Sequence, residues 1–337
     1  MDWISKAGIL LTVLGAATLF GETSALARPL ATPESECTPV DLRDDFPVKM
    51  RNQNGISWCY AHAASDLLQF TYRIPVQISA ADIAINYAES DVSKVITFFK
   101  RIFSAGARAE PPQTGFIKKA IKKTLPEGYC PEEFLPSEHW TRVDAKSGQR
   151  SRTGILDAIL DSYAIQKKVR SGAIRSPEEL DHYYEFPHVN RDQFFDLVRN
   201  SRKASFLYRL RGLACSGERR PYPSVQLDLD FQVSGRRVFK KINPALGSRT
   251  PVGLDFFSGI FDDYEHFKKK IIDLHTVLLY GRRFDAGLKE CVYLMKNSYG
   301  EDCSQYDPAI KCEKGYLWFP ESRLYRSMVS ILRVEKD

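Results

Sequence analysis

The hydrophobic pattern of this chain changes its period along the sequence. Apolar residues near the start recur at spacings of three and four, as at Ala61, Ala64 and Leu68, which is the period of an amphipathic helix. Between residues 225 and 233 every second residue is apolar, which is the period of a half-buried strand. Helices in the first half and strands in the last third predict an α+β fold, in which a helical lobe faces a sheet or β-barrel-like lobe.

The same patterns predict the individual elements. Helices are expected at residues 59–72, 79–89, 115–125, 151–172 and 190–200. Strands are expected at residues 225–233, 250–259, 275–281, 291–300 and 315–320. Ser79 is placed to cap the second helix, and Asp82 occupies the carboxylate position of a capping box.

The first residues are typical of an export signal. Lys6 supplies positive charge, residues 7–20 are apolar, and Ala25 and Ala27 form a small-x-small cleavage site. An uncleaved membrane anchor is the alternative, but the apolar run is shorter than the roughly 20 residues that a spanning helix needs. We therefore expect cleavage after Ala27, an extended leader at 28–40, and a soluble protein that is secreted or periplasmic.

The chain contains seven cysteines, which in an exported protein predicts disulfide bonds with one thiol left over. If Cys59 is the free thiol, three bridges among the other six allow about 15 connectivities, and the sequence does not choose among them. Cys303 and Cys312 flank a turn-like segment and are the best local pair. A zinc site is the competing interpretation, and the absence of any CxxC pair disfavours it. We expect no metal.

The charge pattern argues against a nucleic-acid partner. The formal net charge is +6, and the basic residues are spread out, with short clusters such as residues 118–123. There is no basic tail and no basic stripe interleaved with aromatic residues, so these clusters are best read as solvated helix faces. Attraction to an anionic surface stays open.

Three residues in separate segments of the sequence suggest nucleophilic catalysis. Cys59 opens the first predicted helix, where backbone N–H groups and the helix dipole favour a thiolate. A nucleophilic cysteine needs a base, usually His, and the base needs an orienting partner. His275 begins one apolar strand and Asn297 ends another, so adjacent strands could bring them together. His62, on the helix of Cys59, is the less favoured base.

Four segments that occur in this order resemble the papain family of cysteine peptidases. They are "QNGISWC" at 53–59, "HTVLLYG" at 275–281, "KNSYG" at 296–300 and "KGYLWF" at 314–319. The likeness covers roughly residues 40–130 and 240–325. It implies a two-lobed fold with the active-site cleft between a helical lobe and a β-barrel-like lobe.

The resemblance also implies a role for each of four residues. Cys59 would be the thiolate nucleophile, and His275 would pair with it as an imidazolium and protonate the leaving amine. Asn297 would orient the imidazole. The side chain of Gln53 and the backbone N–H of Cys59 would form the oxyanion hole. Water would then hydrolyse the thioester acyl-enzyme.

This chain departs from the family pattern around the cysteine. The usual signature is C-G-[SA]-C-[WY], and here Ile56 replaces the first cysteine and Ser57 the glycine. Trp58 replaces a small residue next to the nucleophile, which predicts a bulkier substrate surface.

The substrate-binding residues are weaker predictions. The glycine-rich stretch that pairs with substrate backbone in the family is not recognisable, and Gln113, Thr114 and Gly115 occupy its place. Tyr299 stands where the family has an indole, and it would still shield the hydrogen bond between Asn297 and His275.

The spacing predicts an insertion. His275 follows Cys59 by 216 positions, against about 130–150 in the family, so an insertion is expected at about 137–235 with two amphipathic helices and an Arg-rich loop. It could be a lid, an inhibitory flap, a partner surface or a peripheral decoration. The region between Ala27 and Asp41 is too short for the long pro-segment of the family, so an inhibitor or the insertion itself could restrain activity.

These observations favour an exported cysteine peptidase that acts on peptides or proteins, as a monomer and without a cofactor. Two alternatives use the same scaffold. One is a binding protein that has lost turnover, with Trp58 and the insertion filling the cleft. The other is an acyl transferase or peptide ligase that passes the thioester to an amine.

Overall fold

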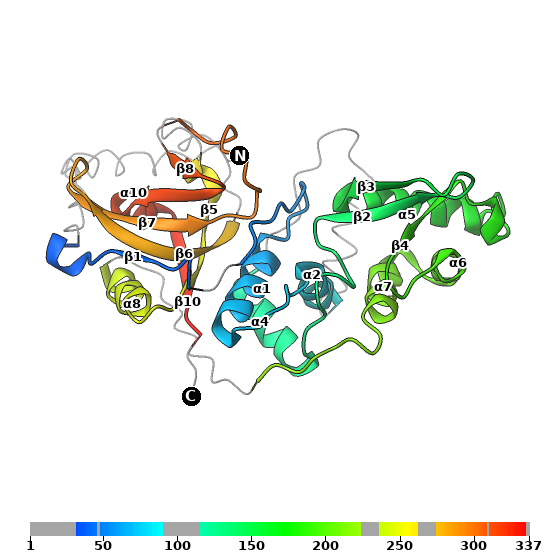
Figure 1. Cartoon of the computed structure of the whole chain (residues 1–337), viewed down its shortest axis with the longest axis horizontal. Helices are drawn as coiled ribbons and strands as arrows, with labels where there is room; N and C mark the ends of the chain where they lie inside the picture. The colour runs from blue at the N-terminus through cyan, green and yellow to red at the C-terminus, as the bar shows by residue number, and fades with distance from the viewer. Residues whose placement is uncertain are drawn as a thin grey trace, which may run out of the picture.

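A computed structural model of the chain describes residues 32–45, 48–89, 115–223, 236–261, 274–308 and 310–334. The export signal, the strand expected at 225–233, and both Gln113 and Thr114 lie outside these residues. Figure 1 shows three parts in a row: a sheet lobe, a helical lobe in the centre, and an outer unit beyond it. The chain has the α+β, two-lobed architecture that the sequence predicts.

The central lobe is helical. Its helices are α1 (Cys59–Tyr72), α2 (Ala80–Glu89) and α4 (Ile117–Thr124). Every side chain of α1 is buried, because α2 and α4 pack on it from one side and strand β6 of the sheet lobe from the other. Phe70 of α1 meets Tyr280 of β6 edge to face, with 5.7 Å between ring centroids. The core therefore runs through α1 from one lobe into the other.

The second lobe is a seven-stranded sheet in which every pair of strands is antiparallel. The strand order is β10-β5-β6-β7-β9-β8, and β1 pairs with β6. The strands are β1 (Val40–Asp41), β5 (Val252–Phe257), β6 (Leu274–Asp285), β7 (Glu290–Lys296), β8 (Lys311–Glu313), β9 (Tyr316–Pro320) and β10 (Met328–Leu332). Helices α8 (Arg236–Gly247) and α10 (Glu321–Ser327) pack against the sheet.

The outer unit, residues 138–223, contains more structure than the two helices expected there. Three helices, α5 (Ile155–Arg170), α6 (Arg191–Asn200) and α7 (Phe206–Ala214), accompany a small antiparallel sheet of order β3-β2-β4. Its strands are β2 (His139–Asp144), β3 (Arg150–Gly154) and β4 (His182–Glu185). The sequence did not predict these strands, because they are short and largely polar and so show little alternation of apolar residues.

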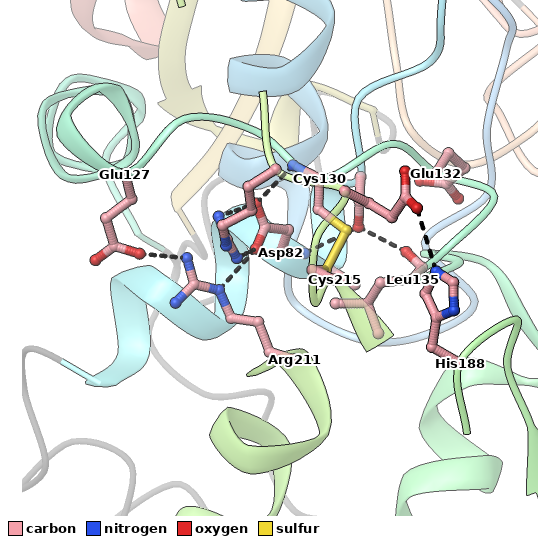
Figure 2. The surroundings of a disulfide bond; sticks show 12 residues. Asp82, Glu127, Cys130, Glu132, Leu135, His188, Arg211 and Cys215 are labelled. Atoms are coloured by element: carbon pink, nitrogen blue, oxygen red, sulfur yellow. Dashed lines mark hydrogen bonds and ion pairs between the residues drawn. A yellow bond between two sulfur atoms is a disulfide. The ribbon is translucent and has the colours of Figure 1, made fainter. Parts of the chain in front are cut away.

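One buried carboxylate ties the outer unit to the helical lobe. Asp82 of α2 is fully buried and forms ion pairs with Arg211 and Arg219 of the outer unit. Arg211 reaches it at 2.6 Å, and Figure 2 shows this pair beside the disulfide bond. Ser79 caps α2 as expected, since its hydroxyl accepts from the Asp82 N–H at 3.0 Å. The capping-box role of the Asp82 side chain is wrong, because that carboxylate faces the two arginines instead.

The six other cysteines are all paired, and Cys59 is the free thiol. Cys303–Cys312 is the local pair that the sequence suggested. Cys130–Cys215 joins the helical lobe to the outer unit (Figure 2). Cys37–Cys291 fixes the segment before β1 to β7. Val40, the last residue of the leader expected at 28–40, begins the short strand β1.

Candidate active site

A cavity of about 360 Å³ opens where the helical lobe meets the sheet lobe. Four of the residues proposed from the sequence line it: Gln53, Cys59, His275 and Tyr299. Of the residues that the structure describes, the others in its wall are Asn52, Gly55, Ser57, Ser258, Leu274 and Gln305. Cys59 and His275, more than two hundred positions apart, therefore face one space.

Cys59 is the first residue of α1, so its backbone N–H has no partner within the helix. Its side chain borders the cavity although the residue is only 1% exposed. Burial raises the pKa of the Cys59 thiol to about 12, against hydrogen bonds from Thr276 and from the backbone of Tyr60 that lower it. The contact with Thr276 brings the sulfur to the residue that follows His275.

His275 lies at the start of β6, with its ring among aromatic side chains. Its Nε2 is 2.7 Å from Oδ1 of Asn297. The rings of Phe256, Phe261 and Tyr299 surround it, with centroids 5.6, 5.5 and 5.0 Å away. Burial lowers the pKa of His275 to about 4, and the hydrogen bond to Asn297 opposes that shift. The imidazole is therefore neutral at neutral pH.

The amide of Asn297 has a defined orientation, because the backbone N–H of Ser298 can only donate and must therefore face its oxygen. Its Oδ1 accepts from the backbone N–H of Ser298 at 2.8 Å, and its Nδ2 donates to the hydroxyl of Tyr306 at 3.0 Å. Since Oδ1 can only accept, Nε2 of His275 must carry the proton. The other ring nitrogen, Nδ1, is then unprotonated and can act as a base.

Gln53 is held by the residue that follows Asn297. Its backbone N–H donates to the carbonyl of Ser298, and its Oε1 accepts from the Ser298 hydroxyl, each at 2.8 Å. Because Oε1 is occupied, the Nε2 group of Gln53 is the donor left for a molecule in the cavity. Ser298 thus connects the loop before α1 with the end of β7.

A buried ionic cluster lies behind the site and crosses the interface between the lobes. Asp66 of α1 accepts from Arg51 and, at 2.5 Å, from Nζ of Lys296, the residue before Asn297. All three side chains are at most 5% exposed. A buried charge needs a partner of opposite sign; here the Asp66 carboxylate pairs with both cations, and Arg51 also pairs with Glu132 at 3.5 Å. The cluster ties the helix of Cys59 to the strand that leads to Asn297.

Other residues named from the sequence lie away from the cavity. Trp58 is 9% exposed and packs in the core, and it is not among the described residues that line the cavity. Gly115 packs on the ring of Tyr60, where an added Cβ would come within 2.8 Å of ring atoms. His62 is buried, and neither of its ring nitrogens has a hydrogen-bond partner among the described residues.

Sequence reasoning missed three side chains that complete the arrangement. Ser298 was visible in the "KNSYG" motif, but nothing in the sequence indicates that its hydroxyl reaches Gln53. Tyr306 and Thr276 carry no recognisable signal, since their importance comes only from contacts with Asn297 and Cys59.

The part of the chain that the structure describes contains no group of three or more His, Cys, Asp or Glu side chains placed to hold a metal ion. Nor does it contain a helix long and apolar enough to cross a membrane.

The fold resembles that of papain-like cysteine proteases. Xylellain, a cysteine protease from Xylella fastidiosa, is 15% identical over 92% of both chains, with a TM-score of 0.47. The bromelain protease from Ananas comosus is 11% identical, covering 91% of this chain and 100% of its own, with a TM-score of 0.43. Digestive procathepsin L 3 from Tenebrio molitor is 13% identical, covering 91% and 74%, with a TM-score of 0.44.

No family model matches the chain, and no curated protein is similar to it in sequence. The solved structures are distant, so their likeness is one of overall fold.

Proposed function

We propose that the chain is a papain-like cysteine peptidase, with Cys59 as nucleophile and His275 as its base. The observation that carries this proposal is the 2.7 Å bond between His275 Nε2 and Asn297 Oδ1 beside the cavity that Cys59 lines. That bond assigns the proton to Nε2 and leaves Nδ1 to take a proton from a thiol. Asn297 would act as the residue that orients the imidazole.

The charge state of the resting pair follows from burial. Burial raises the pKa of Cys59 and lowers that of His275, and both directions favour the neutral thiol and the neutral imidazole. The proton would then move from sulfur to Nδ1 as the sulfur attacks a bound substrate. The thiolate–imidazolium pair expected from the resemblance remains a prediction, and both of these pKa shifts oppose it.

The reaction balances with these groups alone. The Cys59 sulfur bonds to the substrate carbonyl carbon while His275 takes the thiol proton. His275 then gives this proton to the leaving amine as the C–N bond breaks, and a thioester remains. Water attacks the thioester, passes a proton to His275, and the C–S bond breaks to release the acid. The Cys59 sulfur regains its proton from His275.

The negative oxygen of each tetrahedral intermediate needs donors. The Nε2 group of Gln53 and the backbone N–H of Cys59 are proposed for this role. The first is supported by the bond that occupies Gln53 Oε1, and the second by the position of Cys59 at the first turn of α1. One such donor typically contributes roughly 10²–10³-fold in kcat.

Export is part of the proposal. Three disulfide bonds fit an oxidising compartment outside the cytoplasm. The signal-like residues 1–27 and the absence of a later apolar span in the sequence support the same view.

The burial of Cys59, at 1% exposure, favours one second candidate, a binding protein of the same fold without turnover. Its thiol would stay inert, whereas a peptidase thiol must meet its substrate. Alkylation by iodoacetamide at pH 6 separates the two, because a peptidase is expected to be labelled at Cys59 in a one-to-one ratio.

A peptide-library digest with the wild type and with Cys59→Ala tests the main proposal. We expect cleavage by the wild type, yielding free carboxylates, and none by Cys59→Ala, whose circular dichroism should match the wild type. Cleavage by folded Cys59→Ala at the wild-type rate would overturn the assignment of the nucleophile.

A further inference from the structure

The loop that carries Gln53 is held from two sides. On one side the sheet lobe holds it, since Gln53 bonds to Ser298 and Asn52 bridges to Tyr299. The loop then turns through Asn54 and Gly55, whose φ values of 47° and 74° lie in the left-handed region. Glycine adopts this backbone without steric cost and asparagine tolerates it, so the pair favours the turn at this point.

The second support comes from the outer unit, through Glu138 at its first position. The Glu138 carboxylate accepts from the backbone N–H of Asn52 at 2.7 Å. Its backbone carbonyl accepts from the side-chain amide of Asn54 at 2.8 Å. Both neighbours of Gln53 in the sequence are therefore bonded to one residue. Leu156 of α5 lies next to Gly55, 3.7 Å from where a Cβ would stand.

Glu138 is itself firmly placed. Its side chain is 17% exposed, and its ionic partner, Lys49, lies at 3.9 Å and is 68% exposed. Its carbonyl also accepts from the N–H of Ile155 at 2.9 Å, at the start of α5. The contact of Glu138 with Asn52 is thus shorter and less exposed than its contact with Lys49. Because Glu138 also bonds to Ile155, a movement of α5 would be transmitted through Glu138 to the loop.

We propose that Glu138 is a positioning residue that holds the loop at 52–55 so that the Gln53 amide faces the cavity. This inference rests on the proposed peptidase function and adds a task for the outer unit. The unit completes the oxyanion site from behind, without touching the substrate. It is then neither a lid over the cavity nor a decoration without effect on catalysis.

The role of Glu138 depends on an acceptor more than on a charge. Glu138→Ala removes the acceptor for the Asn52 N–H, and Glu138→Gln keeps an oxygen that can accept it. Glu185→Ala is the matched control, since Glu185 is a glutamate of the same unit that pairs with Arg150 on the surface.

Three measurements on the full-length mature protein separate positioning from general damage. The first is kcat and KM on a fluorogenic peptide. The second is the inhibition constant of a peptide aldehyde, whose oxygen takes the oxyanion position when Cys59 adds to its carbonyl. The third is the rate of alkylation by iodoacetamide, a displacement at a saturated carbon that forms no oxyanion.

We expect Glu138→Ala to lower kcat and to weaken the binding of the aldehyde by a similar factor, roughly 10- to 100-fold. Its alkylation rate should stay within about twofold of the wild type, since the nucleophile and its base are untouched. Glu138→Gln and Glu185→Ala should resemble the wild type in all three measurements.

The inference would be overturned if Glu138→Ala matched the wild type in kcat and in aldehyde affinity. It would also be overturned if the alkylation rate of Glu138→Ala fell by the same factor as its kcat. If Glu138→Ala does not fold, Asn54→Gly keeps the left-handed turn while removing the bond to the Glu138 carbonyl, and the same selective loss is expected. If the wild type cleaves peptides and the variant is unaffected, only the role of Glu138 is refuted. A wild type that never cleaves refutes the peptidase as well.

Discussion

The Oε1 atom of Gln53 accepts a hydrogen bond of 2.8 Å from the hydroxyl of Ser298, which lies 245 positions further along the chain. Ser298 also donates its backbone N–H to Asn297, the partner of His275. One serine therefore links the proposed oxyanion donor to the group that orients the proposed base. Both halves of the site depend on the end of β7.

Asn297→Ala should lower kcat without abolishing activity. The His275 ring would lose its partner but keep the aromatic rings that pack around it, so the loss should be at most roughly 10²-fold, the lower end of what acid–base catalysis contributes. Steady-state kinetics on a fluorogenic peptide measures this. Asn297→Asp, which keeps an acceptor for the Nε2 proton, should be less affected. An Asn297→Ala enzyme as fast as the wild type would show that another residue orients the ring.

Ser298→Ala should act through Gln53. Without the hydroxyl, the Gln53 amide can rotate, and we expect kcat to fall about 10-fold, less than the roughly 10²–10³-fold expected for Gln53→Ala. The double variant Gln53→Ala/Ser298→Ala should be no slower than Gln53→Ala alone, because the serine would have nothing left to position. Fully additive losses in this double-mutant cycle would argue against the link.

The acid limb of the pH–rate profile should lie near pH 4. Burial lowers the pKa of His275 from 6.5 to about 4, so the neutral ring, which is the base, persists above that pH. Activity is expected to be present at pH 5 and to be lost as the pH falls through about 4. Measuring kcat/KM between pH 3.5 and 8 tests this, and a limb at pH 6.5 would indicate a histidine exposed to solvent.

The same shift has a consequence for stability. The unfolded chain binds a proton on His275 more tightly than the folded protein does, so the stability from this group is complete above about pH 6.5 and declines as the pH falls toward 4. His62 is shifted in the same direction by burial. Glu132, whose pKa burial raises to about 7, opposes this slope, so the quantity to measure is the urea midpoint of the wild type minus that of His275→Gln, which should rise between pH 4.5 and 7.

Asp66→Asn should destabilise the fold strongly. It would leave Arg51 and Lys296 buried without a full negative charge between them, and breaking one partner of a buried pair costs about 3–5 kcal/mol. Urea unfolding at pH 7 measures the loss. Glu185→Gln is the control, since it breaks an ion pair at the surface and should leave the midpoint near that of the wild type. Equal effects from the two variants would contradict the importance of this cluster.

The sequence indicated much of the local structure because local structure repeats along the chain. The spacing of apolar residues located α1, α2, α4, α5 and α6 and the main strands of the sheet lobe. It failed for β2, β3 and β4, whose polar residues show no period of two, and for α7. It also misjudged Asp82, because a helix-capping position says nothing about two arginines that approach from more than a hundred positions away.

The sequence by itself determined the residue types available for the site and their order, Gln53, Cys59, His275 and Asn297, since these are read directly from the chain. Tertiary structure decided which atoms meet: that Asn297 bonds to Nε2 of His275, that Ser298 holds Gln53, and that Glu138 holds the residues beside it. The physical reason is range. Periodicity and capping act over a few residues, whereas these bonds join segments from 22 to 245 positions apart and exist only in the folded chain, where β6 pairs with β7 and α1 packs against the sheet.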